Sequence, residues 1–167
     1  GLTFDLALHF GTLTAVVIYY RQDLWRMTAA VFSREDSPTA DAHRRLGWGL
    51  VLSTIPAVIV GLSMSDAFVE SLRTPWLIAA DLIVFGILLG LADRFGSRQR
   101  DVWSMSFRDA LLIGLAQALA LIPGVSRSGI TMTALLAMGM TRIDAARYAF
   151  LMSVPIVAAA AAHGLMS

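Results

Sequence analysis

The segment of this sequence best suited to chemistry is Pro123-Gly-Val-Ser-Arg-Ser-Gly129, in which one arginine lies between serines and glycines. Glycines allow successive backbone N–H groups to turn toward a bound anion. Ser126 and Ser128 offer hydroxyls, and Arg127 offers a planar fork of donors that matches phosphate oxygens. Because every polar side chain here can donate a hydrogen bond, the segment predicts a site for phosphate or pyrophosphate.

The segment needs help from elsewhere if it is to perform acid–base chemistry. No carboxylate or histidine lies between Asp109 and Arg142, so a general base must come from another part of the fold. Asp5 and His9 are four residues apart on one helical face, and we favour a pair that satisfies itself. Gln117 either hydrogen-bonds a neighbouring helix or holds the site, and we lean to the site.

The segment around Arg127 is long and almost free of charge. The 32 residues from Ala110 to Thr141 carry Arg127 as their one charge. One helix of that length would measure about 48 Å, against a hydrocarbon core of about 30 Å. Breaks at Pro123-Gly124 and Ser128-Gly129 instead predict two half-length helices, about 109–122 and 129–140, that enter and leave the membrane on one side.

The remaining sequence predicts an all-α integral membrane protein, a multi-span helical bundle forming one domain. Of 167 residues 57% are hydrophobic and 15% charged, whereas soluble domains carry about 25% charged residues. The long apolar runs lack the alternation of a membrane β-barrel. Spans are predicted at about 1–20, 48–65, 76–92 and 148–166, with the re-entrant pair at about 109–140.

The distribution of charge predicts an orientation. Residues 21–45 hold five arginines, residues 94–108 hold four and residues 142–147 hold two, whereas 66–75 hold only Arg73. The positive-inside rule places the Arg-rich segments in the cytoplasm. The net charge of +1 gives no indication of nucleic-acid binding, and the absence of cysteine excludes disulfides and thiolate chemistry.

Three stretches carry a resemblance to a known family. Gln117-Ala-Leu-Ala-Leu-Ile-Pro123-Gly-Val-Ser-Arg127-Ser-Gly-Ile-Thr131 resembles the second signature of bacterial undecaprenyl-pyrophosphate phosphatases, the bacitracin-resistance family. Phe4-Asp-Leu-Ala-Leu-His-Phe-Gly-Thr-Leu-Thr-Ala-Val16 resembles the first full span after that family's N-terminal motif. Tyr148-Ala-Phe-Leu-Met-Ser-Val-Pro155 resembles the span that follows the second motif.

The resemblance implies six spans and two re-entrant helix pairs arranged as inverted repeats, in a multi-pass protein of the bacterial plasma membrane. It implies hydrolysis of undecaprenyl pyrophosphate to undecaprenyl phosphate and inorganic phosphate, which recycles the lipid carrier for peptidoglycan synthesis and confers bacitracin resistance. It also implies a divalent cation, Mg²⁺ or Ca²⁺, and a polyprenyl pyrophosphate partner.

The same resemblance assigns roles to residues. Arg127 matches the family's essential arginine, and we predict Arg127, Ser126 and Ser128 as catalytic residues. The predicted substrate-binding residues are Gly124, Gly129, Thr131 and Gln117. The resemblance leaves the metal ligands within this sequence unassigned.

The sequence departs from the family pattern at both ends. The first signature, Glu-x-x-x-Glu followed by Pro-x-Ser-Ser-x-Gly-His, is absent from it, as are the last spans. We therefore expect these 167 residues alone to be inactive. The alternative function is a membrane transporter or lipid flippase with an anion site at a broken helix, which phosphate release would distinguish.

Overall fold

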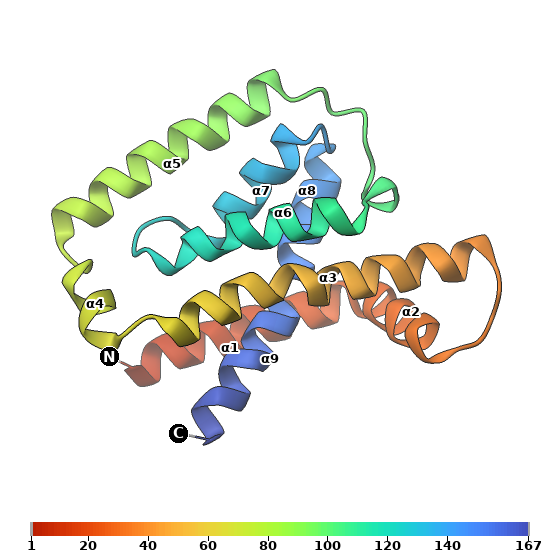
Figure 1. The fold of residues 1–167 in the computed structure, drawn as a ribbon, viewed down its shortest axis with the longest axis horizontal. Helices are drawn as coiled ribbons and strands as arrows, with labels where there is room; N and C mark the ends of the chain where they lie inside the picture. Colours follow the sequence, from red (N-terminus) through yellow and green to blue (C-terminus); the bar gives the residue numbers. More distant parts are fainter. Residues whose placement is uncertain (1, 167) are drawn as a thin grey trace.

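The computed structural model describes the backbone of residues 2–166 and the side chains of residues 7–65 and 67–159. Every regular element in this part is helical, which confirms the all-α prediction (Figure 1). The elements are α1 Leu2–Tyr19, α2 Arg21–Phe32, α3 Pro38–Ser63, α4 Asp66–Ser71, α5 Pro75–Phe95, α6 Phe107–Ala118, α7 Arg127–Ala137, α8 Arg142–Leu151 and α9 Ser153–Met166, with single 3-10 turns η1 Val102–Ser104 and η2 Leu119–Leu121.

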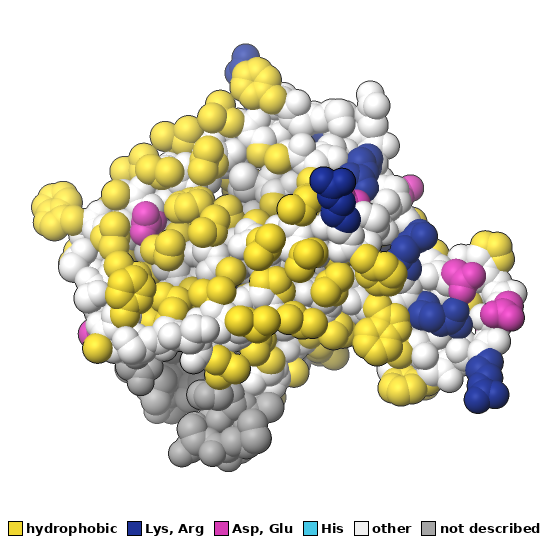
Figure 2. Space-filling view, viewed as in Figure 1, with side chains coloured by type: hydrophobic (Ala, Val, Ile, Leu, Met, Phe, Trp, Pro, Cys, Tyr) yellow, Lys and Arg dark blue, Asp and Glu magenta, His cyan; other side chains and the backbone are white. Residues whose placement is uncertain are grey.

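Two helices among the described residues, α3 and α5, are long and apolar enough to cross a membrane, with mean hydropathies of 1.8 and 2.1. None of the described side chains of α5 is buried, and the helix lies along one edge of the molecule (Figure 1). Apolar side chains cover the face over α3, α5 and α6 (Figure 2). This exposed apolar surface is typical of a protein that faces lipid rather than water.

Helix α3 begins earlier than the span predicted at 48–65. Ser37 caps it by accepting a hydrogen bond from the Ala40 N–H at 3.1 Å, and Pro38 occupies the first turn, where its missing N–H has no cost. The Arg-rich residues 21–45 therefore form α2, a short connection and the first turns of α3.

Helices α6 and α7 form an antiparallel hairpin where the sequence predicts two half-length helices. Ser106 and Asp109 begin α6 with a capping box, in which each side chain bonds the other's backbone N–H. Gly114 lets α6 approach α3 closely, because a Cβ there would lie 2.7 Å from the Ser53 carbonyl oxygen. The turn between α6 and α7 lies at the end of the hairpin away from the 96–106 connection (Figure 1).

The last predicted span, 148–166, is divided between two helices. Helix α8 ends at Leu151 and α9 begins at Ser153. Pro155 lacks the N–H that would continue the ladder at this point. Tyr148 fixes α8 in the core, because its hydroxyl shares a 2.7 Å hydrogen bond with Ser53 Oγ, which in turn donates to the Ala110 carbonyl of α6.

The three Arg-rich segments meet at one end of the molecule. Arg147 of α8 pairs with Asp23 of α2 at 3.3 Å, and Arg142 pairs with Asp93 of α5 at 2.5 Å. Arg45 of α3 donates to the Trp103 carbonyl oxygen at 2.7 Å. Helix α4, followed by Arg73, lies at the other end (Figure 1). The segments predicted to share one side of a membrane therefore lie together, and the orientation itself stays a prediction.

Candidate anion-binding site

The turn between α6 and α7 requires glycine at position 124. Its φ of +98° lies in the left-handed region, which side chains other than glycine rarely adopt. A Cβ there would also lie 2.8 Å from the Ile78 carbonyl oxygen and 3.0 Å from the Asp81 Cβ of α5. Gly124 therefore packs the turn directly against the backbone of α5.

Ser126 begins α7 in a strained conformation. Its φ of +58° is uncommon for a residue other than glycine and indicates local strain. Its Oγ accepts a hydrogen bond from the Gly129 N–H at 3.3 Å, which makes Ser126 the N-cap. Gly129 leaves room for this cap, because a Cβ there would lie 3.1 Å from Ser126 Oγ. The cap fixes Arg127 as the first residue of the helix.

The start of α7 retains free donors. The backbone N–H groups of Ser126, Arg127 and Ser128 form no hydrogen bond with any described residue. Unpaired N–H groups at a helix N-terminus, together with the helix dipole, favour an anion.

The side chain of Arg127 lines a cavity of about 180 Å³. The cavity lies between the start of α7, helix α1 and the start of α9, and its lining consists of Leu8, His9, Thr12, Leu13, Arg127, Ser153 and Val157. Arg127 is partly buried, and its guanidinium forms neither an ion pair nor a hydrogen bond with any described residue. A desolvated charge left without a partner is costly, so this arrangement favours a bound anion.

The chemistry of the lining agrees with this interpretation. Each polar side chain among the described lining residues, on His9, Thr12, Arg127 and Ser153, carries an N–H or O–H group that can donate. None of the described residues around this cavity is a carboxylate. The cavity thus suits phosphate oxygens rather than a metal cation.

Of the residues predicted from the sequence, the structure brings Arg127 alone to this cavity. Ser126 and Gly129 shape the start of α7, and Ser128 follows Arg127 in its first turn. Thr131 is 1% exposed, and its hydroxyl donates to the Arg127 carbonyl oxygen at 2.8 Å. Their roles toward a substrate remain predictions.

Gln117 lies in the interface between α6 and α3. It is 1% exposed, and its Nε2 donates to the Ser53 carbonyl oxygen at 3.2 Å. Its Oε1 is buried without a hydrogen-bond partner among the described residues. The alternative weighed from the sequence, a hydrogen bond to a neighbouring helix, is therefore the contact that the structure shows.

The structure also adds residues that sequence reasoning missed or undervalued. His9 lines the cavity with Arg127. The pair that the sequence suggests between His9 and Asp5 stays a prediction, because the Asp5 side chain lies outside the described residues. Thr12 and Ser153 line it too. No spacing could have identified them, because α1 and α9 reach Arg127 only through the tertiary fold.

Comparison with known proteins gives consistent results. The family model described as bacitracin resistance protein BacA matches residues 1–167. The undecaprenyl-diphosphatase of Thioalkalivibrio sulfidiphilus is 51% identical over 96% of this chain and 60% of its own length. The undecaprenyl-diphosphatase of Trichlorobacter lovleyi is 48% identical over 96% of this chain and 60% of its own length. Undecaprenyl-diphosphatase 1 of Pseudoalteromonas translucida is 46% identical over 94% and 59%.

In each comparison the match covers a larger share of this chain than of the relative. Nearly all of this chain is matched, but it spans about 60% of the length of the curated relatives. The matched part includes α1, the α6–α7 hairpin and the start of α9, which together surround Arg127.

Proposed function

Because this chain belongs to the bacitracin resistance protein BacA family, we propose that it carries the diphosphate-binding part of an enzyme that hydrolyses undecaprenyl diphosphate. The products are undecaprenyl phosphate and inorganic phosphate. The reaction returns the lipid carrier to cell-wall synthesis, and it underlies the bacitracin resistance in the family's name. The names of the relatives support this substrate.

One observation carries the proposal: Arg127 faces a donor-lined cavity with no partner among the described residues. In the proposed reaction an oxygen nucleophile attacks the terminal phosphorus, and the bond from that phosphorus to the bridging oxygen breaks. The electron pair leaves with undecaprenyl phosphate. Arg127 binds the diphosphate and stabilises the charge that develops on its oxygens, an effect worth about 100-fold or more in rate for a single donor.

The described residues around Arg127 offer no general base of the carboxylate type. The family resemblance assigns activation of the nucleophile to the Glu-x-x-x-Glu and His signature, which this sequence lacks. We propose the same origin for the ligands of a divalent cation. Among the described residues no group of three or more acidic or histidine side chains could hold a metal. The cavity described here does not fit a cation by itself.

We further propose that the protein is a multi-pass protein of the bacterial plasma membrane, with the Arg-rich end in the cytoplasm. The exposed apolar surface of α5 and the gathering of the Arg-rich segments at one end support this placement. The α6–α7 hairpin would then be re-entrant from the cytoplasmic side, with its turn at membrane depth. Helix α5 covers one side of that turn, where Gly124 packs against Ile78, and Val125 is buried.

Phosphate release tests the proposal. The protein encoded by the complete reading frame, purified in detergent, should liberate phosphate from a prenyl diphosphate. Arg127→Lys should largely abolish this release, because an ammonium cannot reproduce the planar fork of donors. A near-normal turnover in that variant would contradict the proposal that Arg127 binds the diphosphate.

A transporter or flippase is the second candidate, because broken helices that direct an N-terminus at an anion also occur in secondary transporters. The same assay separates the two functions. A protein that binds prenyl diphosphate and moves it across a vesicle membrane, yet releases no phosphate, would support the second candidate.

A further inference from the structure

The cavity that Arg127 lines also carries polar side chains from two other helices. His9 belongs to α1 and Ser153 begins α9, so two helices distant from the α6–α7 hairpin in sequence present donors to the same space as Arg127. Leu8, Leu13 and Val157 are the apolar residues of its lining. Polar groups are thus confined to a few positions of an otherwise apolar lining, as in a site that orients a ligand.

We propose that His9 and Ser153 are further substrate-binding residues, which donate hydrogen bonds to the diphosphate in the cavity that Arg127 also lines. This inference rests on the proposed function and extends it to α1 and α9. Arg127 binds the anion from the start of α7. The imidazole of His9 and the hydroxyl of Ser153 bind it from α1 and α9.

Ser153 is suited to this role by its burial and its hydrogen bonding. It is 4% exposed, and its hydroxyl donates to the Phe150 carbonyl oxygen in the preceding turn. A serine hydroxyl rotates readily, so it can turn from this carbonyl oxygen toward a phosphate oxygen.

His9 is suited by its accessibility to a ligand. Its side chain is exposed, so an incoming headgroup can reach it. A volume of about 180 Å³ equals roughly six water molecules at about 30 Å³ each, which is enough for a phosphate group. Donors from three helices suit an anion with several oxygens, a property of free pyrophosphate and of a lipid diphosphate alike.

The experiment compares variants of the protein from the complete reading frame. His9→Leu removes the donor, His9→Gln keeps an N–H group without the ring, and Ser153→Ala removes the hydroxyl. The matched controls are Phe10→Leu and Ser63→Ala. Phe10 is the next residue of α1, and Ser63 also donates to its own helix, but neither lines the cavity. Each variant is assayed for hydrolysis of a prenyl diphosphate and for inhibition by inorganic pyrophosphate.

We expect His9→Leu to raise KM and the inhibition constant of pyrophosphate by about tenfold or more, the usual effect of losing a hydrogen bond to a charged group. Ser153→Ala should raise both by about three- to tenfold. His9→Gln should lie between His9→Leu and the wild type, and the controls should match the wild type. A shift for the prenyl diphosphate but not for pyrophosphate would place His9 against the lipid phosphate rather than a free anion.

The outcomes separate this inference from the proposed function. A wild-type protein that releases no phosphate refutes the function, and pyrophosphate binding by calorimetry still tests the two residues. If the wild type is active and Arg127→Leu is not, unchanged KM and pyrophosphate affinity in His9→Leu and Ser153→Ala overturn the inference. Should His9→Leu fail to fold, His9→Gln and Ser153→Ala decide it on the same readouts.

Discussion

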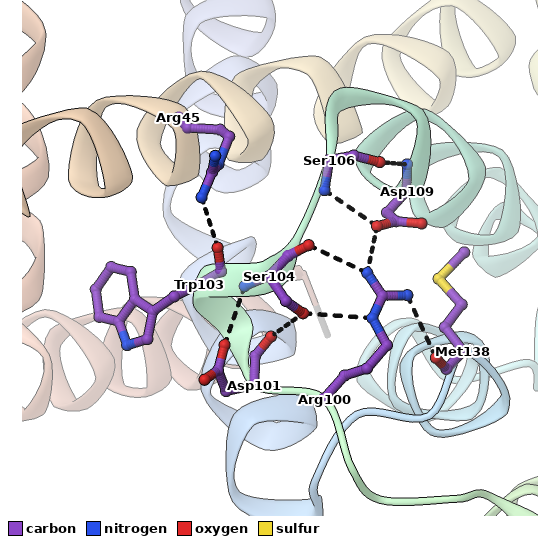
Figure 3. A network of polar contacts seen from close by, with 8 residues as sticks. All are labelled: Arg45, Arg100, Asp101, Trp103, Ser104, Ser106, Asp109 and Met138. Atoms are coloured by element: carbon purple, nitrogen blue, oxygen red, sulfur yellow. Dashed lines mark hydrogen bonds and ion pairs between the residues drawn. The ribbon is translucent and has the colours of Figure 1, made fainter. Parts of the chain in front are cut away.

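Two arginines near opposite ends of the α6–α7 hairpin have contrasting environments. Arg100 lies in the connection before α6, where its Nη2 pairs with the Asp109 carboxylate at 2.6 Å and its Nη1 donates to the Met138 carbonyl oxygen at 3.3 Å (Figure 3). It also donates to the carbonyl oxygen of Ser104 at 3.2 Å. Arg127, at the turn, has no such partner among the described residues.

The contrast separates a structural arginine from one kept available for a ligand. Arg100 joins the start of α6 to the end of α7, and its backbone adds bonds of 2.9 Å to Gly139 and 3.0 Å to Thr141. The base of the hairpin is therefore fixed by satisfied polar groups. At its other end, the turn of the hairpin carries the charge of Arg127 and the free N–H groups at the start of α7.

The largest expected effect comes from Arg127→Leu. Hydrolysis should fall by about 100-fold or more, because the donor that stabilises the developing charge is lost. The free energy of unfolding should stay unchanged or rise, because the substitution replaces an unpaired, partly buried charge with an apolar side chain. Turnover and thermal unfolding in detergent measure the two quantities. A large loss of stability would show that Arg127 is as structural as Arg100.

Arg100→Leu should show the opposite behaviour. It removes an ion pair and hydrogen bonds to carbonyl oxygens, so the free energy of unfolding should fall by about 2–3 kcal/mol. Turnover per folded molecule should be kept, since Arg100 does not line the cavity.

The matched control is Arg108→Leu. Arg108 is exposed on α6 and forms no ion pair or hydrogen bond with a described side chain, so its removal should change stability by less than about 0.5 kcal/mol. Equal losses in the two variants would contradict the structural role of Arg100.

Gly124→Ala tests how the turn is positioned. The φ of +98° and the approach of the Ile78 carbonyl oxygen should make alanine cost about 1–2 kcal/mol of stability. Gly86→Ala on α5 is the control, because a Cβ there meets nothing within 4 Å and alanine favours a helix. Thermal unfolding of both variants measures the difference. A neutral Gly124→Ala would show that the turn does not pack against α5 as described.

Much of this architecture follows from local sequence. The break at Pro123-Gly124, the two half-length helices and the apolar runs of α3 and α5 all depend on residues close together in the chain, so pattern alone predicts them. The capping of α7 by Ser126 is also local. These features need no knowledge of which helices become neighbours.

The rest depends on tertiary contacts. Ser153 and His9 reach Arg127 only because α9 and α1 pack beside α7, and no spacing in one sequence encodes that meeting. Gln117 shows the converse, because a polar residue near a motif is instead used in packing α6 against α3. The division of the last span at Met152 is likewise not predicted, because the apolar run 148–166 continues through it without a charged residue.

Ser126→Gly gives the smallest expected effect and sharpens the contrast at the turn. Glycine adopts a φ of +58° without strain, whereas loss of the N-cap oxygen costs a few tenths of a kcal/mol when glycine replaces serine. The free energy of unfolding should therefore change by less than about 0.5 kcal/mol, while Ser126→Ala keeps the strain and should lose about 1 kcal/mol.

Because stability is nearly unchanged, the turnover of Ser126→Gly then measures the contribution of the hydroxyl to the reaction. We expect a loss far below that of Arg127→Leu, because Ser126 Oγ bonds the Gly129 N–H and does not line the cavity. A loss as large as that of Arg127→Leu would instead place the hydroxyl on the substrate, in the catalytic role that the sequence predicts.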